Sequence, residues 1–239
     1  MRFLAGSVAI IAWLGAVTAR PGEMDFHPLT ESSEGLIESR RAGDVQALQE
    51  MFGSSQRPQR WRQAPELTIL VSVMDYQPGG DVEYVATQEK LSEAEIAELV
   101  RDLSDGLAVL TANTFEQFAS VSRVHMSAGS TARVSRPDHI VTARFNGLRR
   151  SMKTLGFGGR RARKDGTITA GAILLDSEAD RTHAKRRLLR THELGHALGY
   201  NHVHSRMSIM NPRMGTEPSD FDREAAFIAF RAPAPVASR

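Results

Sequence analysis

Apolar residues recur along this chain at two spacings, one typical of strands and one typical of helices. Short apolar runs predict strands over residues 67–74, 82–87, 118–125 and 139–145. A fifth run, residues 171–176 with the sequence GAILLD, predicts a buried strand just before a longer helical pattern. The chain therefore contains enough strand to build a sheet.

Helices are predicted where apolar residues share one face. Ser92 and Glu95 have the spacing of a capping box, which satisfies backbone N–H groups at the start of a helix. The apolar positions after them repeat every three or four residues. They are Ile96, Leu99, Val100, Leu103, Leu107 and Leu110.

Two more helices follow toward the end of the chain. One is expected to begin near Ser177 or Asp180 and to end at Leu198. The last is capped by Ser219 or Asp220. Strands and helices in this irregular order predict an α+β fold.

Two basic segments interrupt the apolar pattern. Arg186, Arg187 and Arg190 project about 120–160° away from His192 on a helix, so we interpret them as its solvated back. A site for a polyanion is the alternative. Residues 144–164 are basic and rich in glycine, which favours an exposed, flexible loop.

The last turns of the helix that ends at Leu198, and the residues after it, have the sequence HELGHALGYNH (residues 192–202). This sequence predicts a metal site. His192 and His196 are four residues apart and share one helix face, so both can bind one ion. Glu193 projects about 100° from His192 and lies beside that ion, where a general base for an activated water is needed. Gly199 permits a sharp helix exit that brings His202 back as a third ligand. Three protein ligands leave a fourth position open, as in catalytic zinc sites.

These residues resemble the extended zinc motif of metzincin metallopeptidases, the clan that includes matrixins, astacins and adamalysins. Met210, in the sequence SIMNP, falls on the Met-turn of that clan. The resemblance is closest to matrixins of bacterial type. It implies a metzincin-like zincin fold, with a mixed twisted sheet, an active-site helix and a small C-terminal subdomain. It also implies that Met210 forms an apolar floor beneath the histidines.

The resemblance further implies how a substrate binds. In metzincins an extended polypeptide adds to an edge strand above the zinc helix through main-chain hydrogen bonds. The run before the helix occupies that place in the chain order. We therefore expect the substrate edge strand to contain Gly171, Ala172, Ile173 and Leu174.

The ends of the chain predict processing and flexible segments. Residues 1–19 have a basic start and an apolar stretch that ends in small residues, which predicts a cleaved signal peptide. An uncleaved membrane anchor is the alternative, but the apolar run is short for a bilayer. Residues 20–60 are interpreted as a pro-segment or linker, residues 61–231 as the catalytic domain and residues 232–239 as a flexible tail. The protein is therefore expected to be secreted or periplasmic.

Composition narrows the partners. The chain has 30 basic and 28 acidic residues, and removal of residues 1–19 takes away one arginine, so the net charge falls from +2 to +1. Such a balance gives no reason to expect nucleic acid binding. The absence of cysteine excludes a thiolate plug on zinc and any disulfide. We expect a monomer that binds one Zn²⁺ ion and acts on polypeptides, without a membrane partner after signal cleavage.

The motif predicts an exported zinc endopeptidase in which Glu193 acts as the general base. Two alternatives stay open at this point. One is a zinc-containing binding or adhesion module that does not cleave, although zinc binding alone does not require Glu193. The other is a zinc hydrolase of a non-protein amide or ester, since the motif does not choose the bond.

Overall fold

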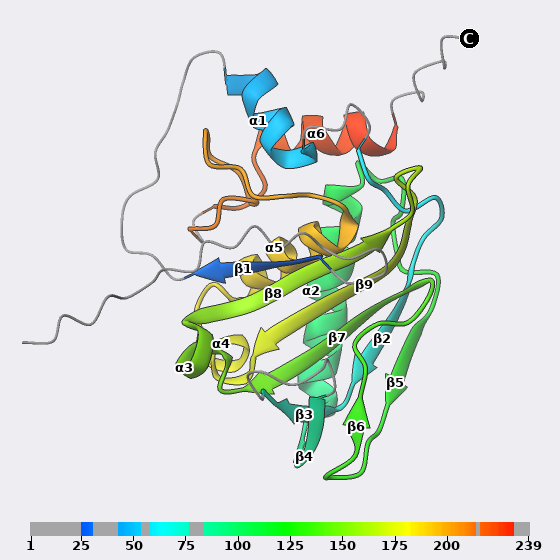
Figure 1. Ribbon diagram of the computed structural model, residues 1–239, viewed down its shortest axis with the longest axis vertical. Coiled ribbons are helices and arrows are strands. Elements are labelled where there is room, and N and C mark those ends of the chain that lie inside the picture. Colours follow the sequence, from blue (N-terminus) through cyan, green and yellow to red (C-terminus); the bar gives the residue numbers. More distant parts are fainter. Residues whose placement is uncertain (1–24, 31–42, 54–57, 77–83, 214–215, 232–239) are drawn as a thin grey trace, which may run out of the picture.

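The computed structural model describes residues 25–30, 43–53, 58–76, 84–213 and 216–231. Within them, nine strands form one mixed, twisted sheet (Figure 1). The strands are β1 (Asp25–Thr30), β2 (Glu66–Leu70), β3 (Ser72–Asp75), β4 (Tyr84–Lys90), β5 (Val121–Val124), β6 (Thr131–Ala132), β7 (His139–Asn146), β8 (Thr154–Ala162) and β9 (Ile168–Asp176).

Strand β7 organises the sheet. It runs parallel to β9 on one side, and on the other it pairs with β2 along its first half and β3 along its end. β8 is antiparallel to β9, and β1 is antiparallel to β8. The sheet therefore ends, on the side beyond β8, with the N-terminal strand β1.

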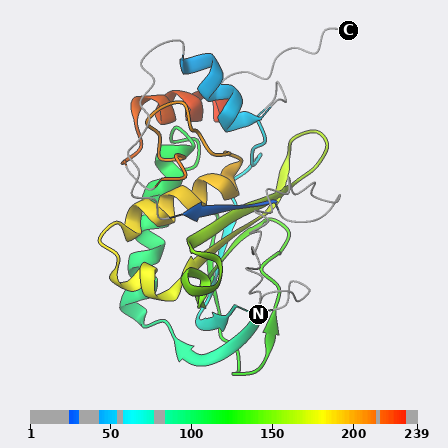
Figure 2. The same ribbon diagram turned by 60° about the vertical axis from the view of Figure 1, so that its left-hand side comes forward.

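The described chain also contains six helices. They are α1 (Gly43–Phe52), α2 (Glu93–Leu110), α3 (Leu148–Met152), α4 (Ser177–Thr182), α5 (Arg186–Leu198) and α6 (Asp220–Phe230). Figure 2 shows α2 and α5 side by side on the same face, with α1 and α6 near one end. The main hydrophobic core lies between these helices and the sheet. The predicted α+β fold is confirmed.

Helix α2 confirms the apolar stripe and its cap. The Ser92 side chain accepts from the Glu95 backbone N–H, and the Glu95 carboxylate accepts from the Ser92 backbone N–H at 2.7 Å. Ser219 and Asp222 form the same reciprocal pair at the start of α6. In α2 the predicted cap residue is the one observed, and in α6 the structure selects Ser219 from the two predicted candidates.

Two predicted elements are divided in the structure. Residues 67–74 form β2 and β3, because the chain shifts register near Ser72 as it moves along β7. The predicted helix between residues 177 and 198 forms α4 and α5, because His183 leaves helical geometry with a ψ of 129°. Periodicity alone does not reveal such breaks, since the apolar residues on either side still face one core.

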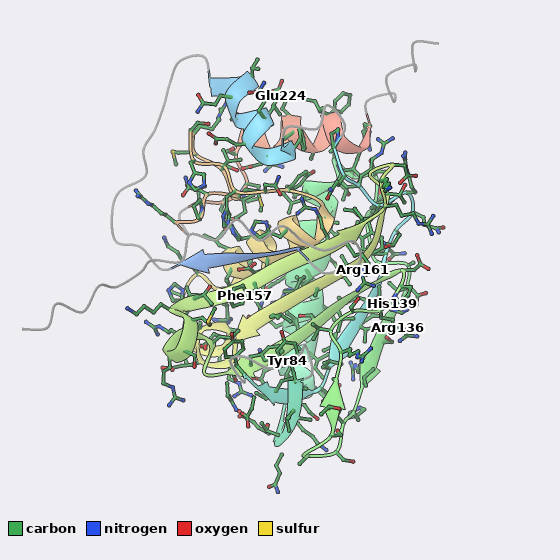
Figure 3. All side chains as sticks on the ribbon, viewed as in Figure 1. Tyr84, Arg136, His139, Phe157, Arg161 and Glu224 are labelled. Atoms are coloured by element: carbon green, nitrogen blue, oxygen red, sulfur yellow. The ribbon has the colours of Figure 1, made fainter. Side chains whose placement is uncertain are left out.

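The largest error concerns residues 144–164, which we predicted to be an exposed loop. They form the end of β7, α3 and the nine-residue strand β8. Glycines in β8 allow close contact with α5, so the feature that suggested flexibility reflects packing. Phe157, labelled in Figure 3, packs on the opposite face against a second cluster that includes Leu174 and Phe145.

The N-terminal region is partly built into the folded unit. Ala47 and Met51 of α1 belong to the main core, and the Asn201 backbone N–H donates to Met51 O at 2.8 Å. Residues 43–53 are therefore packed against the metal-bearing half of the chain. That residues 20–60 form a removable pro-segment stays a prediction.

Two terminal predictions concern residues that the structure does not describe. The signal peptide (residues 1–19) and the flexible tail (residues 232–239) lie outside the described residues. Among the helices that are described, none combines the length and the hydrophobicity needed to cross a membrane.

Candidate metal centre

Three histidine rings meet where α5 ends and the chain folds back. Their Nε2 atoms form a nearly equilateral triangle. The sides are 3.1 Å between His192 and His196, 3.2 Å between His196 and His202, and 3.3 Å between His192 and His202. Two nitrogens bound to one tetrahedral zinc ion, each about 2.0–2.1 Å from it, lie about 3.3 Å apart. The triangle therefore fits one zinc ion.

His204 does not join this triangle. Its side chain is exposed, and its ring centroid lies 6.0 Å from that of His202. His192 and His196 are buried and His202 is half-buried. The structure thus brings together the three histidines that the motif spacing selected.

The outer nitrogens of the first two histidines are held by backbone carbonyls. His192 Nδ1 lies 2.6 Å from Ile209 O, and His196 Nδ1 lies 2.8 Å from Tyr200 O. A carbonyl oxygen can only accept, so each Nδ1 carries the proton and each Nε2 keeps its lone pair toward the triangle. Such contacts orient a histidine ligand and set its tautomer.

Glu193 lies beside the triangle and is completely buried. Neither carboxylate oxygen makes a hydrogen bond of standard geometry within the described chain, although the backbone N–H of Gly158 is close enough to interact. Burial raises the pKa of Glu193 well above its usual range, and the backbone of Gly158 opposes this rise. A carboxyl group in this environment is suited to taking up and returning a proton near neutral pH.

The turn after α5 depends on Gly199. Its φ of 120° lies in the region that residues with a side chain rarely adopt, and a Cβ atom there would overlap with Gln59 O. Trp61 Nε1 also donates to Ala197 O at 2.9 Å, and Tyr200 Oη donates to Leu110 O at 2.6 Å. The helix exit is therefore anchored from several elements.

Met210 packs beneath α5. Its side chain is fully buried, and a Cβ atom on Gly195 would overlap with Met210 Sδ. The Val203 backbone N–H, next to the third histidine, donates to Met210 O at 3.0 Å. The methionine therefore packs against the helix that carries two of the histidines, and the glycine makes that contact possible. That Met210 forms an apolar floor under the histidines stays a prediction.

The expected substrate edge strand is wrong. Gly171, Ala172, Ile173 and Leu174 lie in β9, which pairs with β7 on one side and with β8 on the other. A strand paired on both sides has no free edge for a peptide. The strand next to α5 on the outer side is β8, which the sequence reading took for a loop.

Arg160 is a residue of this site that the sequence reading missed. It is buried on β8, and its guanidinium donates to His196 O and Tyr200 O, both at 3.4 Å, and to Asn201 Oδ1 at 2.8 Å. A cation at the C-terminus of a helix is favoured by the helix dipole. Arg160 therefore holds the backbone between the second and third histidines.

Asp222 is a second residue that was missed. Its buried carboxylate accepts from the Ile209 backbone N–H at 2.9 Å and from the Ser208 hydroxyl. The carbonyl oxygen of the same residue, Ile209, accepts from His192 Nδ1. Its place in the Ser219 capping box was the available signal, but the contact with the Met-turn is not visible in the sequence.

The arginines of α5 differ from our interpretation of a solvated helix back. Arg190 is 1% exposed and donates to Asp180 at 2.6 Å and to Asp102 at 2.7 Å. Arg144 of β7 also donates to Asp180 at 2.6 Å. Buried guanidinium groups require such acidic partners, which the helical angle of one residue cannot reveal. Arg187 is exposed, as expected.

Comparison with known families agrees with this geometry. Residues 85–225, more than half of the chain, match the family model described as Matrixin. The chain belongs to the matrixin family. The predicted metzincin resemblance is thereby confirmed, and a search of the curated proteins finds no match. As a matrixin, the protein is a zinc-dependent metallopeptidase whose substrates are polypeptides.

Proposed function

We propose that this matrixin is an exported endopeptidase that binds one zinc ion through His192, His196 and His202. The observation that carries the proposal is the triangle of Nε2 atoms, 3.1–3.3 Å on a side, together with a buried carboxyl group on the same helix that makes no standard hydrogen bond. The zinc ion, when bound, acts as a Lewis acid that increases the acidity of water and stabilises negative charge.

Glu193 performs the proton transfers in this proposal. Its carboxylate takes a proton from the attacking water and returns that proton to the nitrogen of the departing amine. Both oxygens are buried and make no standard hydrogen bond, so no donor of the described chain occupies the acceptor sites that must receive that proton. A module that merely binds zinc has no need to bury such a carboxyl group, because burial without a partner costs free energy.

The substrate in this proposal is an extended polypeptide that pairs with β8. Gly156 and Gly158 of this strand approach Glu193 and His196 so closely that side chains there would collide with them. A backbone paired with β8 consequently passes next to the proton-transferring group. The proposal of export rests on the apolar character of residues 1–19.

The experiment is cleavage of an unfolded protein by zinc-loaded wild type and Glu193→Gln. We expect cleavage to fall at least about 100-fold in the variant, because general acid–base catalysis contributes about 10²–10⁴-fold. Zinc content should stay at one equivalent in both. Glu224→Gln makes the same change on the exposed surface of α6 (Figure 3) and should keep full activity. Cleavage that survives Glu193→Gln would overturn the assigned mechanism.

A further inference from the structure

The outer edge of β8 is not open in this structure. The whole of β1, from the N-terminal region, pairs with β8 in antiparallel orientation. Figures 1 and 2 show β1 crossing in front of α5 along the outer side of the sheet. An N-terminal segment therefore lies on the strand that faces the metal-binding helix.

The register places β1 directly over the reactive groups. His27 pairs with Gly158, and Leu29 pairs with Gly156. A Cβ atom on Gly156 would lie 2.7 Å from Glu193 Oε1, and one on Gly158 would overlap with the Glu193 backbone and His196 Cβ. Residues 27–29 thus run along the part of β8 that adjoins the general base and the second histidine.

We propose that residues 25–30 of the same chain occupy the outer edge of β8 in place of a substrate. This inference rests on the proposed function, since it assigns the occupant of the same site. Peptides that extend a sheet bind mainly through main-chain hydrogen bonds, so one strand excludes another from the same edge. A polypeptide substrate must displace β1 before it reaches Glu193.

The covalent connection strengthens this competition. Residues 31–42 join β1 to α1, and α1 is packed in the core beside the turn that carries His202. A tether of this length keeps β1 at an effective concentration on the order of millimolar. A separate peptide with the same intrinsic affinity, supplied at micromolar concentration, is therefore excluded from the β8 edge in most molecules of the protein.

Pro28 indicates which β1 residues donate to β8. Proline has no backbone N–H, so position 28 belongs on the side of the strand that faces away from its partner. Residues of an antiparallel strand alternate between facing toward and away from the partner. His27 and Leu29 consequently donate to β8, whereas Phe26 shares the outward orientation of Pro28.

This alternation supplies a matched pair of variants in the full chain. Leu29→Pro removes an N–H that faces β8, whereas Phe26→Pro removes one that faces away, and each replaces one apolar residue. Both are made together with Glu193→Gln and loaded with zinc, so that binding is measured without cleavage. The probe is a fluorescein-labelled peptide with the sequence of residues 25–30, DFHPLT, and its Kd is measured by fluorescence anisotropy.

We expect Leu29→Pro to bind the probe at least tenfold more tightly than Phe26→Pro, which should match the parent. Hydrogen exchange of the β8 amides should accelerate in Leu29→Pro and slow again when the probe is added. Equal Kd values in the two variants, or no binding in Leu29→Pro while β8 exchanges faster, would overturn the inference. A Leu29→Pro chain that keeps Glu193 is also tested for cleavage of an unfolded protein. If it binds the probe but does not cleave, the peptidase proposal is contradicted and the inference about β1 is not.

Discussion

The metal centre of this matrixin is positioned by the backbone of residues outside the ligand set, and Ile209 shows how. The Ile209 carbonyl accepts from His192 Nδ1, and the Ile209 N–H donates to Asp222. The backbone of one residue thereby connects a proposed ligand to a carboxylate on another helix. A shift of Asp222 is transmitted to the imidazole through two hydrogen bonds.

Asp222→Asn should weaken zinc binding. The amide side chain keeps the shape of the carboxylate but loses its charge and half of its acceptor capacity. The Ile209 backbone N–H is therefore held less firmly. Loss of such outer contacts typically costs about 10–100-fold in metal affinity. The measurement is competition for zinc against a chromogenic chelator.

Asp220→Asn is the matched control for Asp222→Asn. It removes one carboxylate from the same first turn of α6, but its side chain is exposed. We expect its zinc affinity to equal that of the wild type. An equal loss of affinity in both variants would assign the effect to the charge of the helix start, and not to the contact with Ile209.

At the residue scale, the sequence predicts the residues that perform the chemistry better than the residues that hold them in place. The three histidines, Glu193 and Gly199 lie within eleven residues, so their spacing on a helix and a turn is sufficient to identify them. Arg160 lies about 40 residues before the turn it holds, and Asp222 lies 13 residues after Ile209. Contacts between distant residues depend on the tertiary fold, which local spacing does not contain.

At the scale of elements, a cluster of arginine and acidic side chains ties α2, α4, α5 and β7 together. Asp180 of α4 accepts from Arg144 and Arg190, and Arg190 reaches Asp102 of α2. Glu95, at the start of α2, accepts from Arg144 and from Arg181 at 2.8 Å. The metal-bearing helix is thereby fixed to the sheet and to the helix beside it.

Glu95 should make the stability of this cluster sensitive to acid. Desolvation raises the pKa of Glu95, but hydrogen bonds from Ser92, Arg181 and Arg144 outweigh it and lower the pKa from 4.5 to about 2. Since the folded pKa lies below the unfolded one, the stabilisation is complete above about pH 4.5 and is lost as the pH falls toward 2. Allowing for partial exposure, we expect Glu95→Gln to reduce the free energy of unfolding by about 1–2 kcal/mol at pH 7.

Urea unfolding at pH 7 and pH 3 tests this expectation. The difference between wild type and Glu95→Gln should fall to less than about half at pH 3. Glu93→Gln is the control, because its carboxylate pairs with Arg123 but is 77% exposed, and such pairs contribute about 0–1 kcal/mol. A Glu95→Gln penalty that does not change with pH would show that the charge of Glu95 is not its source.

Elements also show why a strand escaped prediction. β8 contains three glycines and two arginines in nine residues, a composition that is rare in strands. Gly156 and Gly158 face α5 at a distance where no Cβ fits, and Arg160 is buried against the end of that helix. By contrast, α2 and β7 have ordinary apolar patterns and were predicted nearly to the residue.

At the scale of the whole molecule, the chain order predicts the fold class, but not which strand lies at the edge. The GAILLD run was correctly read as the strand before the metal-bearing helix. It was placed at the edge because β8 had been read as a loop, and the inserted strand moves β9 to the interior. The position of β1 beyond β8 joins residues separated by more than 100 positions, and no local pattern encodes that pairing.

The whole molecule should respond to zinc as a folded unit. The triangle exists because α5, the turn after it and the Met-turn come together, so zinc binds the folded chain in preference to the unfolded one. Zinc at 100 times its Kd stabilises a folded protein by about 2.7 kcal/mol. For a chain of this size, about 2–4 °C per kcal/mol corresponds to a rise in Tm of about 5–11 °C.

Thermal unfolding of chelator-treated protein, followed with and without added zinc, measures this rise. His202→Ala removes one of the three imidazoles and should abolish most of the rise in Tm, because two imidazoles bind zinc far more weakly than three. His204→Ala removes an exposed imidazole close by and should leave the rise intact. Equal rises in the two variants would mean that zinc stabilises the chain at some other place, and the assignment of the metal to α5 and its turn would fail.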